Sequence, residues 1–197
     1  MAMEHSAPAE HHTSLGVDTR KLAMWVFLGS ECFFFGSLIS TYLLYRSRNL
    51  VGPYPEEVYD IPYTSVSSFV LLMSSLTMVL ALAAIQRGDQ KQLRIWLLAT
   101  AFLGMSFIGG QVYEFSVFAD EGLGLSQNVF GSSFFVLTGF HGAHVSVGIL
   151  MLLSLLVMSL RGKLNTAQSL NVELVGLYWH FVDVVWIVIF TVVYLIK

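Results

Sequence analysis

Five long apolar stretches constrain the fold of this chain more than any other feature. About 20 consecutive apolar residues are enough to cross the hydrocarbon core of a bilayer as a helix, and each stretch reaches that length. The predicted membrane spans are residues 22–45, 64–86, 95–119, 129–160 and 174–196. We therefore expect an all-α membrane protein: one five-helix transmembrane domain over residues 21–197, preceded by a mobile tail over residues 1–20.

The composition agrees with a membrane protein and excludes other classes. Hydrophobic residues make up 55% of the chain and charged residues 12%, whereas soluble proteins carry about 25% charged residues. The ten Lys and Arg residues form no basic block, which excludes a nucleic-acid-binding protein. The single cysteine, Cys32, excludes an intrachain disulfide and a cysteine-based metal site.

The distribution of Lys and Arg between the two ends of the spans predicts the orientation in the membrane. Basic residues are enriched on the cytoplasmic side of membrane proteins. The end of the spans next to the N-terminus has more of them: Arg20, Lys21, Arg87, Lys91, Arg94, Arg161 and Lys163, against Arg46, Arg48 and Lys197 at the other end. We expect a cytoplasmic N-terminus and a C-terminus outside.

The N-terminal tail lacks the apolar segment of a signal peptide. It carries acidic residues and histidines, namely Glu4, His5, Glu10, His11, His12 and Asp18. A plain solvated terminus is the favoured interpretation. Because histidines titrate near neutral pH, a tail that collects protons is the alternative.

Glu31 is the tenth residue of the first span, about 14 Å into the membrane at a rise of 1.5 Å per residue. A charge at this depth is costly, so we expect a buried, mostly neutral carboxyl. It either makes a structural hydrogen bond to a neighbouring helix, with His144 as the favoured partner, or has a proton-linked or lipid-linked role.

Two histidines and a His/Asp pair occupy the last two spans at similar depth. His141 and His144 are three residues apart on the fourth span, and His180 and Asp183 have the same spacing on the fifth. The two histidines are candidates for a metal or haem site, or for hydrogen bonds to an acid on another helix. An adjacent His and Asp can neutralise each other locally. No serine or cysteine nucleophile motif accompanies them, so we predict no catalytic residue. A metal site needs more converging ligands than the two histidines provide, so we predict no metal-ligating residue.

Other polar and small residues predict contacts between helices. Gln111 and Glu114 lie on one face of the third span and are interpreted as a hydrogen-bonded structural pair. Small residues allow close helix approach, so we expect helix contacts, within the bundle or with another subunit, at Gly104, Gly109, Gly139, Gly142 and Ser146.

Four sequence blocks, in order, resemble one family. GLYWHFVDVVWIVIFTVVYL is similar to the final helix of subunit III of haem-copper terminal oxidases, and FGSSFFVLTGFHGAHVSVG to its penultimate helix. GGQVYEF in the third span and FLGSECFFFGSL around Glu31 match in order and spacing. The resemblance covers residues 20–197 and corresponds to the compact five-helix form found in bacterial cytochrome c and quinol oxidases.

This resemblance implies a non-redox subunit of a proton-pumping oxidase that reduces O2 to water in the bacterial plasma membrane. The haems and copper would belong to partner subunits I and II, with no cofactor in this chain. The chain would bind phospholipid, pack mainly against subunit I, with subunit II and further small subunits as other partners, and support the stability and proton uptake of subunit I. Glu31, His144, His180 and Asp183 fall on positions of the family's motifs.

Two alternatives from other classes remain at this stage. Glu31 and Asp183 are compatible with a small proton or solute transporter, although the chain lacks the inverted repeats and broken helices of many transporters. The histidines are compatible with a bis-His haem membrane protein.

Overall fold

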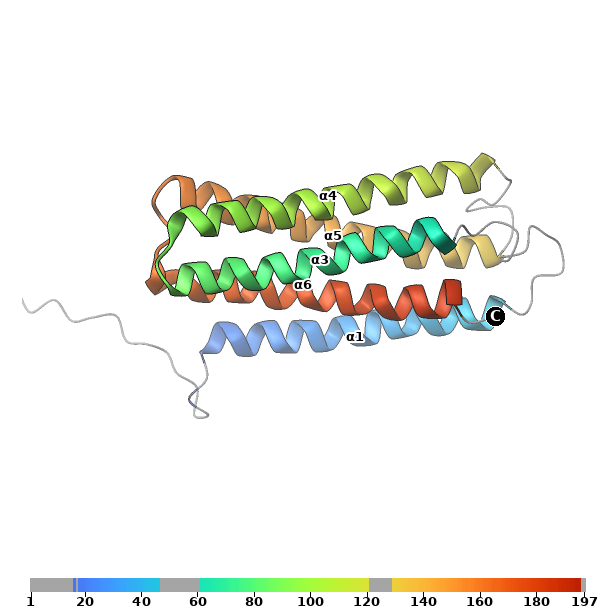
Figure 1. Cartoon of the computed structure of the whole chain (residues 1–197). Coiled ribbons are helices and arrows are strands. Elements are labelled where there is room, and N and C mark those ends of the chain that lie inside the picture. The colour runs from blue at the N-terminus through green and yellow to red at the C-terminus, as the bar shows by residue number, and fades with distance from the viewer. Residues whose placement is uncertain (1–15, 17, 47–60, 121–128, 196–197) are drawn as a thin grey trace, which may run out of the picture.

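The computed structural model describes residues 16, 18–46, 61–120 and 129–195, and these form a bundle of long helices (Figure 1). In chain order the elements are α1 (Thr19–Arg46), α3 (Ile61–Gln86), α4 (Gln90–Asp120), α5 (Val129–Leu160), the 3₁₀ turn η1 (Thr166–Gln168), α6 (Ser169–Phe190) and the π-helical turn η2 (Thr191–Leu195). Within the described residues, five helical segments are long and apolar enough to cross a membrane. The expected all-α, five-span architecture is confirmed.

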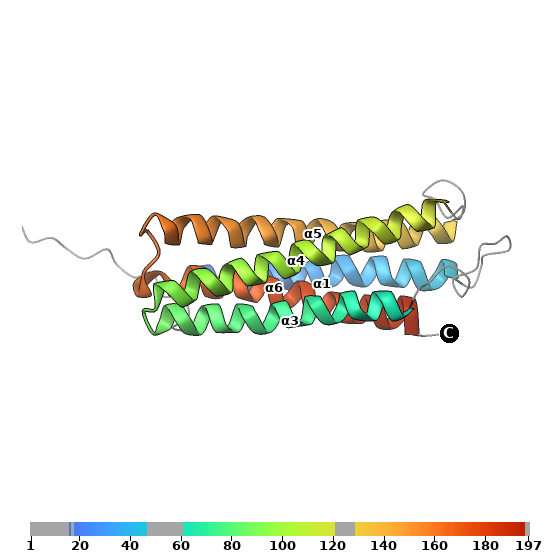
Figure 2. The same cartoon turned by 45° about the horizontal axis from the view of Figure 1, so that its top comes forward.

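The helices pack in an order that differs from their order in the chain. α3 and α4 form an antiparallel hairpin, α5 lies against α4, and α6 packs against both α3 and α5 (Figures 1 and 2). α1 packs along α5 and α6, away from the α3–α4 hairpin. The start of α1 and the end of η2 lie at opposite ends of the bundle, as an odd number of spans requires.

The α3–α4 turn follows directly from its residues. Gly88 has a φ of +77°, a left-handed conformation that glycine adopts without steric cost at the end of a helix. Asp89 then caps α4, because its carboxylate accepts hydrogen bonds from the backbone N–H groups of Lys91 (3.1 Å) and Gln92 (3.0 Å). Two residue types thus end one span and begin the next within a few positions.

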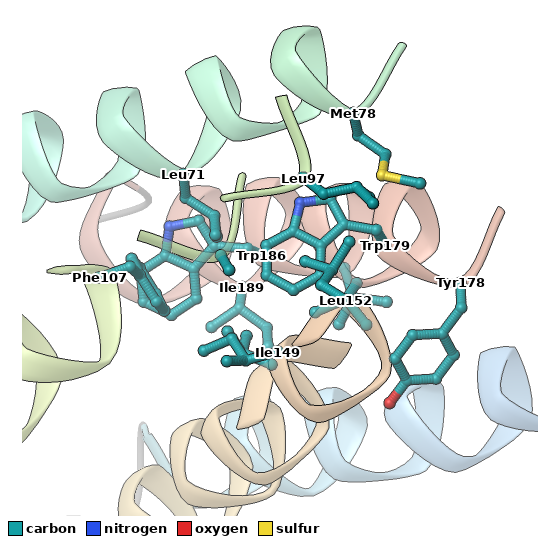
Figure 3. Packing of buried hydrophobic residues seen from close by; sticks show 14 of the residues in the cluster. Leu71, Met78, Leu97, Phe107, Ile149, Leu152, Tyr178, Trp179, Trp186 and Ile189 are labelled. Atoms are coloured by element: carbon teal, nitrogen blue, oxygen red, sulfur yellow. The ribbon is translucent and has the colours of Figure 1, made fainter. Parts of the chain in front are cut away.

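Two tryptophans of α6 occupy the centre of the bundle (Figure 3). The indole N–H of Trp179 donates to Ser74 Oγ at 2.9 Å, and that of Trp186 donates to Ser68 Oγ at 2.8 Å. Both serines lie on α3 and are buried. Each tryptophan therefore combines a large buried ring with a satisfied polar group and fastens α6 to α3.

Glycines on neighbouring helices leave room for large side chains, and sequence analysis predicted only some of these glycine contacts. An ideal Cβ would lie 2.6 Å from a Trp179 ring carbon if added to Gly104, and 2.8 Å from two others if added to Gly148. A Cβ on Gly142 would lie 2.7 Å from Gln111 Oε1. The predicted contacts at Gly104 and Gly142 are confirmed, while Gly148 was missed.

Other predicted small-residue contacts do not occur within the described bundle. No described atom lies within 4 Å of a Cβ built on Gly109 or Gly139, and Ser146 is exposed. At these three positions the predicted helix contact is not made within the described bundle, and a contact with another subunit stays a prediction. Their spacing puts them on helices of the bundle, but on faces that turn away from the neighbouring helices.

Several predicted boundaries also shift. Pro62, which precedes the predicted second span over residues 64–86, lies in the first turn of α3, where proline is tolerated because its missing N–H has no helical partner. The fifth span begins with η1 and α6 rather than at residue 174, and ends in η2. Residues 1–15 and 17, most of the predicted tail, lie outside the described part of the chain.

The first helix is the least covered by the rest of the bundle. In its apolar 18-residue stretch, only 6% is buried inside the bundle. The buried residues of the helix are Phe35 and Tyr42. Phe33, on another side of the helix, is 84% exposed. α1 therefore offers a long apolar surface to lipid or to another membrane protein.

Candidate functional site: polar groups within the bundle

Glu31 of α1 and His144 of α5 form a pair, as predicted. Glu31 Oε2 lies 3.3 Å from His144 Nε2, and the side chains are 17% and 19% exposed. The other ring nitrogen, Nδ1, lies 2.7 Å from the backbone carbonyl oxygen of Phe140. The pair is only partly buried, because α1 covers α5 along one face.

The hydrogen-bond partners fix the number of protons that the pair holds. A carbonyl oxygen only accepts, so Nδ1 of His144 carries a hydrogen and donates it to Phe140. Nε2 then either accepts a proton from a neutral Glu31 carboxyl or donates one to its carboxylate. Both arrangements contain the same shared proton and have no net charge, which makes the pair tolerable at membrane depth.

His180 and Asp183 are also brought together, but through a residue that sequence analysis missed. Ser75 Oγ of α3 lies 3.0 Å from His180 Nδ1 and donates a hydrogen bond to Asp183 Oδ2. No direct ion pair joins His180 to Asp183 within the described residues, and the two side chains are connected through Ser75 instead. A polar residue on α3 facing α6 was the available signal, but α3 contains several serines and threonines.

The cluster of Ser75, His180 and Asp183 is separate from the Glu31–His144 pair. No hydrogen bond or ion pair connects the two groups in the part of the chain that the structure describes. Asp183 is 3% exposed, and its Oδ1 atom has no hydrogen-bond partner among the described residues. The structure therefore contains two separate polar sites. Glu31 and His144 form one, and His180 and Asp183 belong to the other.

Gln111 and Glu114 are both buried and hydrogen-bonded, and their bonds tie α4 to other elements. Gln111 Nε2 donates to the backbone carbonyl of Thr138 on α5 at 2.8 Å. Glu114 Oε1 accepts from Thr64 Oγ1 of α3 (2.8 Å) and from Tyr194 Oη of η2 (3.0 Å). These bonds connect α4 to α5, α3 and η2, so the two residues hold four helical elements together at this end of the bundle.

His141 has a different environment from His144. It is fully buried, and its ring stacks on Trp186 with centroids 4.9 Å apart, while Phe107 meets it edge-on at 5.9 Å. Neither ring nitrogen has a hydrogen-bond partner among the described residues. Two histidines three residues apart therefore have different roles, one polar and one packed among aromatic rings.

These environments do not fit a haem or metal site. Within the described residues, no three His, Cys, Asp or Glu side chains are grouped as metal ligands. Both nitrogens of His144 are engaged, Nδ1 of His180 is engaged with Ser75, and His141 is enclosed by aromatic rings. The histidines serve contacts between helices instead.

Comparison with known proteins decides the family. The sequence profile described as cytochrome c oxidase subunit III matches residues 1–197. This chain belongs to the cytochrome c oxidase subunit III family. Members of known name are similar over nearly their whole length, so the match concerns the complete fold and not a single motif.

Similar members of the family come from bacteria and have two kinds of name. The chain is 38% identical to cytochrome c oxidase subunit 3 of Bacillus sp. (strain PS3), over 96% of this chain and 91% of that protein. It is 38% identical to quinol oxidase subunit 3 of Bacillus subtilis (strain 168), over 98% and 97%. It is 40% identical to a probable quinol oxidase subunit 3 of Staphylococcus saprophyticus, over 98% and 97%.

Family membership and the five apolar helices together identify a multi-pass protein of the bacterial plasma membrane that is part of an oxidase complex. The resemblance inferred from the four sequence blocks is confirmed. The alternatives of a transporter and of a bis-His haem protein are not favoured.

Proposed function

We propose that this chain is the non-redox subunit III of a proton-pumping haem-copper oxidase and supports its subunit I in stability and proton uptake. The observation that carries the proposal is the family match along the whole chain. The engaged nitrogens of His144 and the ring of His141 enclosed by aromatic side chains support the assignment of haems and copper to subunits I and II, because neither histidine is free to ligate a metal.

The partner contacts are proposed from the exposed apolar surface. We place subunit I as the main partner, with subunit II and further small subunits as additional ones. α1, with little of its surface buried by its own bundle, is the helix with most area for partner helices or lipid. Helix association in membranes depends on packing of complementary surfaces, and the exposed glycines of α1, Gly29 and Gly36, allow close approach.

A bound phospholipid is proposed at the end of the bundle where α1 begins. A groove of about 300 Å³ lies between α1 and α6, lined by Lys21, Leu22, Trp25, Glu173 and Leu177. Lys21 Nζ and Glu173 Oε1 are 2.6 Å apart. A zwitterionic headgroup offers a phosphate to the ammonium and a cation to the carboxylate, while an acyl chain follows the apolar wall.

We also propose an orientation in the membrane from the same end of the bundle. Lys21, the α3–α4 turn and the α5–η1 turn lie together there, and they carry most of the Lys and Arg residues. The positive-inside rule supports a cytoplasmic position for this end, with the C-terminus outside. The predicted tail would then be cytoplasmic as well.

Removal of the subunit from the purified oxidase tests the proposed function. We expect the haem and copper spectra and the initial rate to be preserved, while activity decays faster over many turnovers. Adding back the purified chain should restore the lifetime. Immediate loss of haem signals after removal would contradict a non-redox role, and an unchanged lifetime would contradict the supporting role.

A further inference from the structure

The cluster of Ser75, His180 and Asp183 joins two protonatable side chains of α6 through one hydroxyl of α3. The Ser75 oxygen contacts Nδ1 of His180 at 3.0 Å and forms a hydrogen bond with Oδ2 of Asp183. A serine hydroxyl has one hydrogen to donate and lone pairs to accept. It therefore can accept from one of the two neighbours while it donates to the other.

We propose that Ser75, His180 and Asp183 form a proton-exchange relay that stores one proton within the membrane. In the unloaded state, Asp183 is a carboxylate, Ser75 donates to Oδ2, and His180 donates its Nδ1 hydrogen to Ser75 Oγ. A proton that binds His180 Nε2 drives transfer of the Nδ1 proton to Ser75 Oγ, and the original hydroxyl proton moves to Asp183 Oδ2. The loaded state contains a neutral carboxyl and a neutral imidazole with its hydrogen on Nε2.

Burial favours gain of a proton by this cluster. Asp183 is 3% exposed and has no partner for Oδ1 among the described residues, so its carboxylate would depend on the single hydrogen bond from Ser75. Uncompensated charge is costly inside a membrane. The loaded state removes that charge, and the hydroxyl preserves both hydrogen bonds in either state.

His180 provides the entrance to the relay. It is half-buried, whereas Asp183 is buried, and its Nε2 atom has no hydrogen-bond partner in the described part of the chain. Val184, one turn further along α6, and Leu76, the residue after Ser75 on α3, are exposed. The ring therefore lies close to the outer surface of the α3–α6 face, while the carboxyl lies deeper.

The other titratable groups on the packed helices are already occupied. Glu31 of α1 and His144 of α5 pair with each other, and His141 of α5 stacks on Trp186. From α3, Ser75 is the polar group that faces both side chains. The relay is therefore a separate device, and it does not depend on the proposed supporting role of the chain.

Infrared difference spectroscopy of the whole oxidase complex between two pH values tests the relay. We expect a carboxylic C=O band that Asp183→Asn abolishes, and ring bands of the two imidazole tautomers of His180 that change at the same pH. In Ser75→Ala, the change of the Asp183 band and the change of the His180 ring bands should occur at different pH values. Hydrogen–deuterium exchange at the carboxyl should slow, because the variant lacks the hydroxyl that passes the proton between His180 and Asp183.

Two further variants make the outcome decisive. Ser74→Ala removes a neighbouring buried hydroxyl that bonds Trp179 instead, and it should leave the coupling intact. Ser75→Thr retains the hydroxyl and should restore the coupling. An unchanged Ser75→Ala spectrum and exchange rate, or absence of an Asp183 carboxylic band at every pH, would overturn the proposal.

Discussion

The substitution Gly148→Ala should destabilise the bundle because it forces a methyl group into the ring of Trp179. The new Cβ would lie 2.8 Å from both Cε3 and Cζ3 of the indole, whereas carbon atoms in contact are normally about 3.5–4.0 Å apart. Gly104 of α4 lies against another part of the same ring, since a Cβ there would lie 2.6 Å from Cη2. The ring therefore has little room to retreat.

Two effects of opposite sign contribute to the expected change in the unfolding free energy. Overpacking a filled core costs about 1–3 kcal/mol, and replacing glycine by alanine within a helix returns up to about 1 kcal/mol. Gly139→Ala on the same helix is the matched control, because no described atom lies within 4 Å of its Cβ. The difference between the two variants isolates the steric term, which we expect to be about 2 kcal/mol.

The measurement is the unfolding free energy of the full chain, from SDS titration in mixed micelles followed by circular dichroism. A double-mutant cycle with Trp179→Phe identifies the contact. Phenylalanine lacks the distant ring carbons, so its combination with Gly148→Ala should be less destabilising than the sum of the single changes. Additivity within about 0.5 kcal/mol would refute the reasoning, as would equal stabilities of the Gly148 and Gly139 variants.

Three other predictions concern the polar pair, a second glycine and the groove. Glu31→Gln should leave assembly almost normal, because an amide can donate to His144. Glu31→Ala leaves an unpaired imidazole and should cost about 1–3 kcal/mol of stability. Equal yields of assembled oxidase from the two variants would contradict the pairing. Gly142→Leu should displace the Gln111 side chain and reduce recovery of the complex in detergent, whereas Gly139→Leu should not. Similar recovery of the two variant complexes would contradict the contact between Gly142 and Gln111. Lys21→Ala should remove one copurified phospholipid detected by native mass spectrometry, with Lys91→Ala as control, and equal lipid content would count against the groove.

The spans were predictable from sequence because membrane helices depend on a local property. A run of apolar residues of sufficient length crosses the bilayer whatever its neighbours are, and the five predicted segments correspond to the five observed ones. The pairing of Glu31 with His144 was also predictable, because two costly groups at the same depth are most easily satisfied by each other. Motif order and spacing sufficed to identify the family.

The arrangement of the helices was decided only by tertiary packing. Ser75 does not differ in sequence from the other hydroxyl residues of α3, and only the rotation of α3 against α6 places it between His180 and Asp183. Gly148 became a contact and Gly139 did not because the Trp179 ring lies over one and not the other. Sequence specifies which residues are small or polar, whereas the relative rotation of helices, set by the fit of all side chains together, decides which of these residues meet.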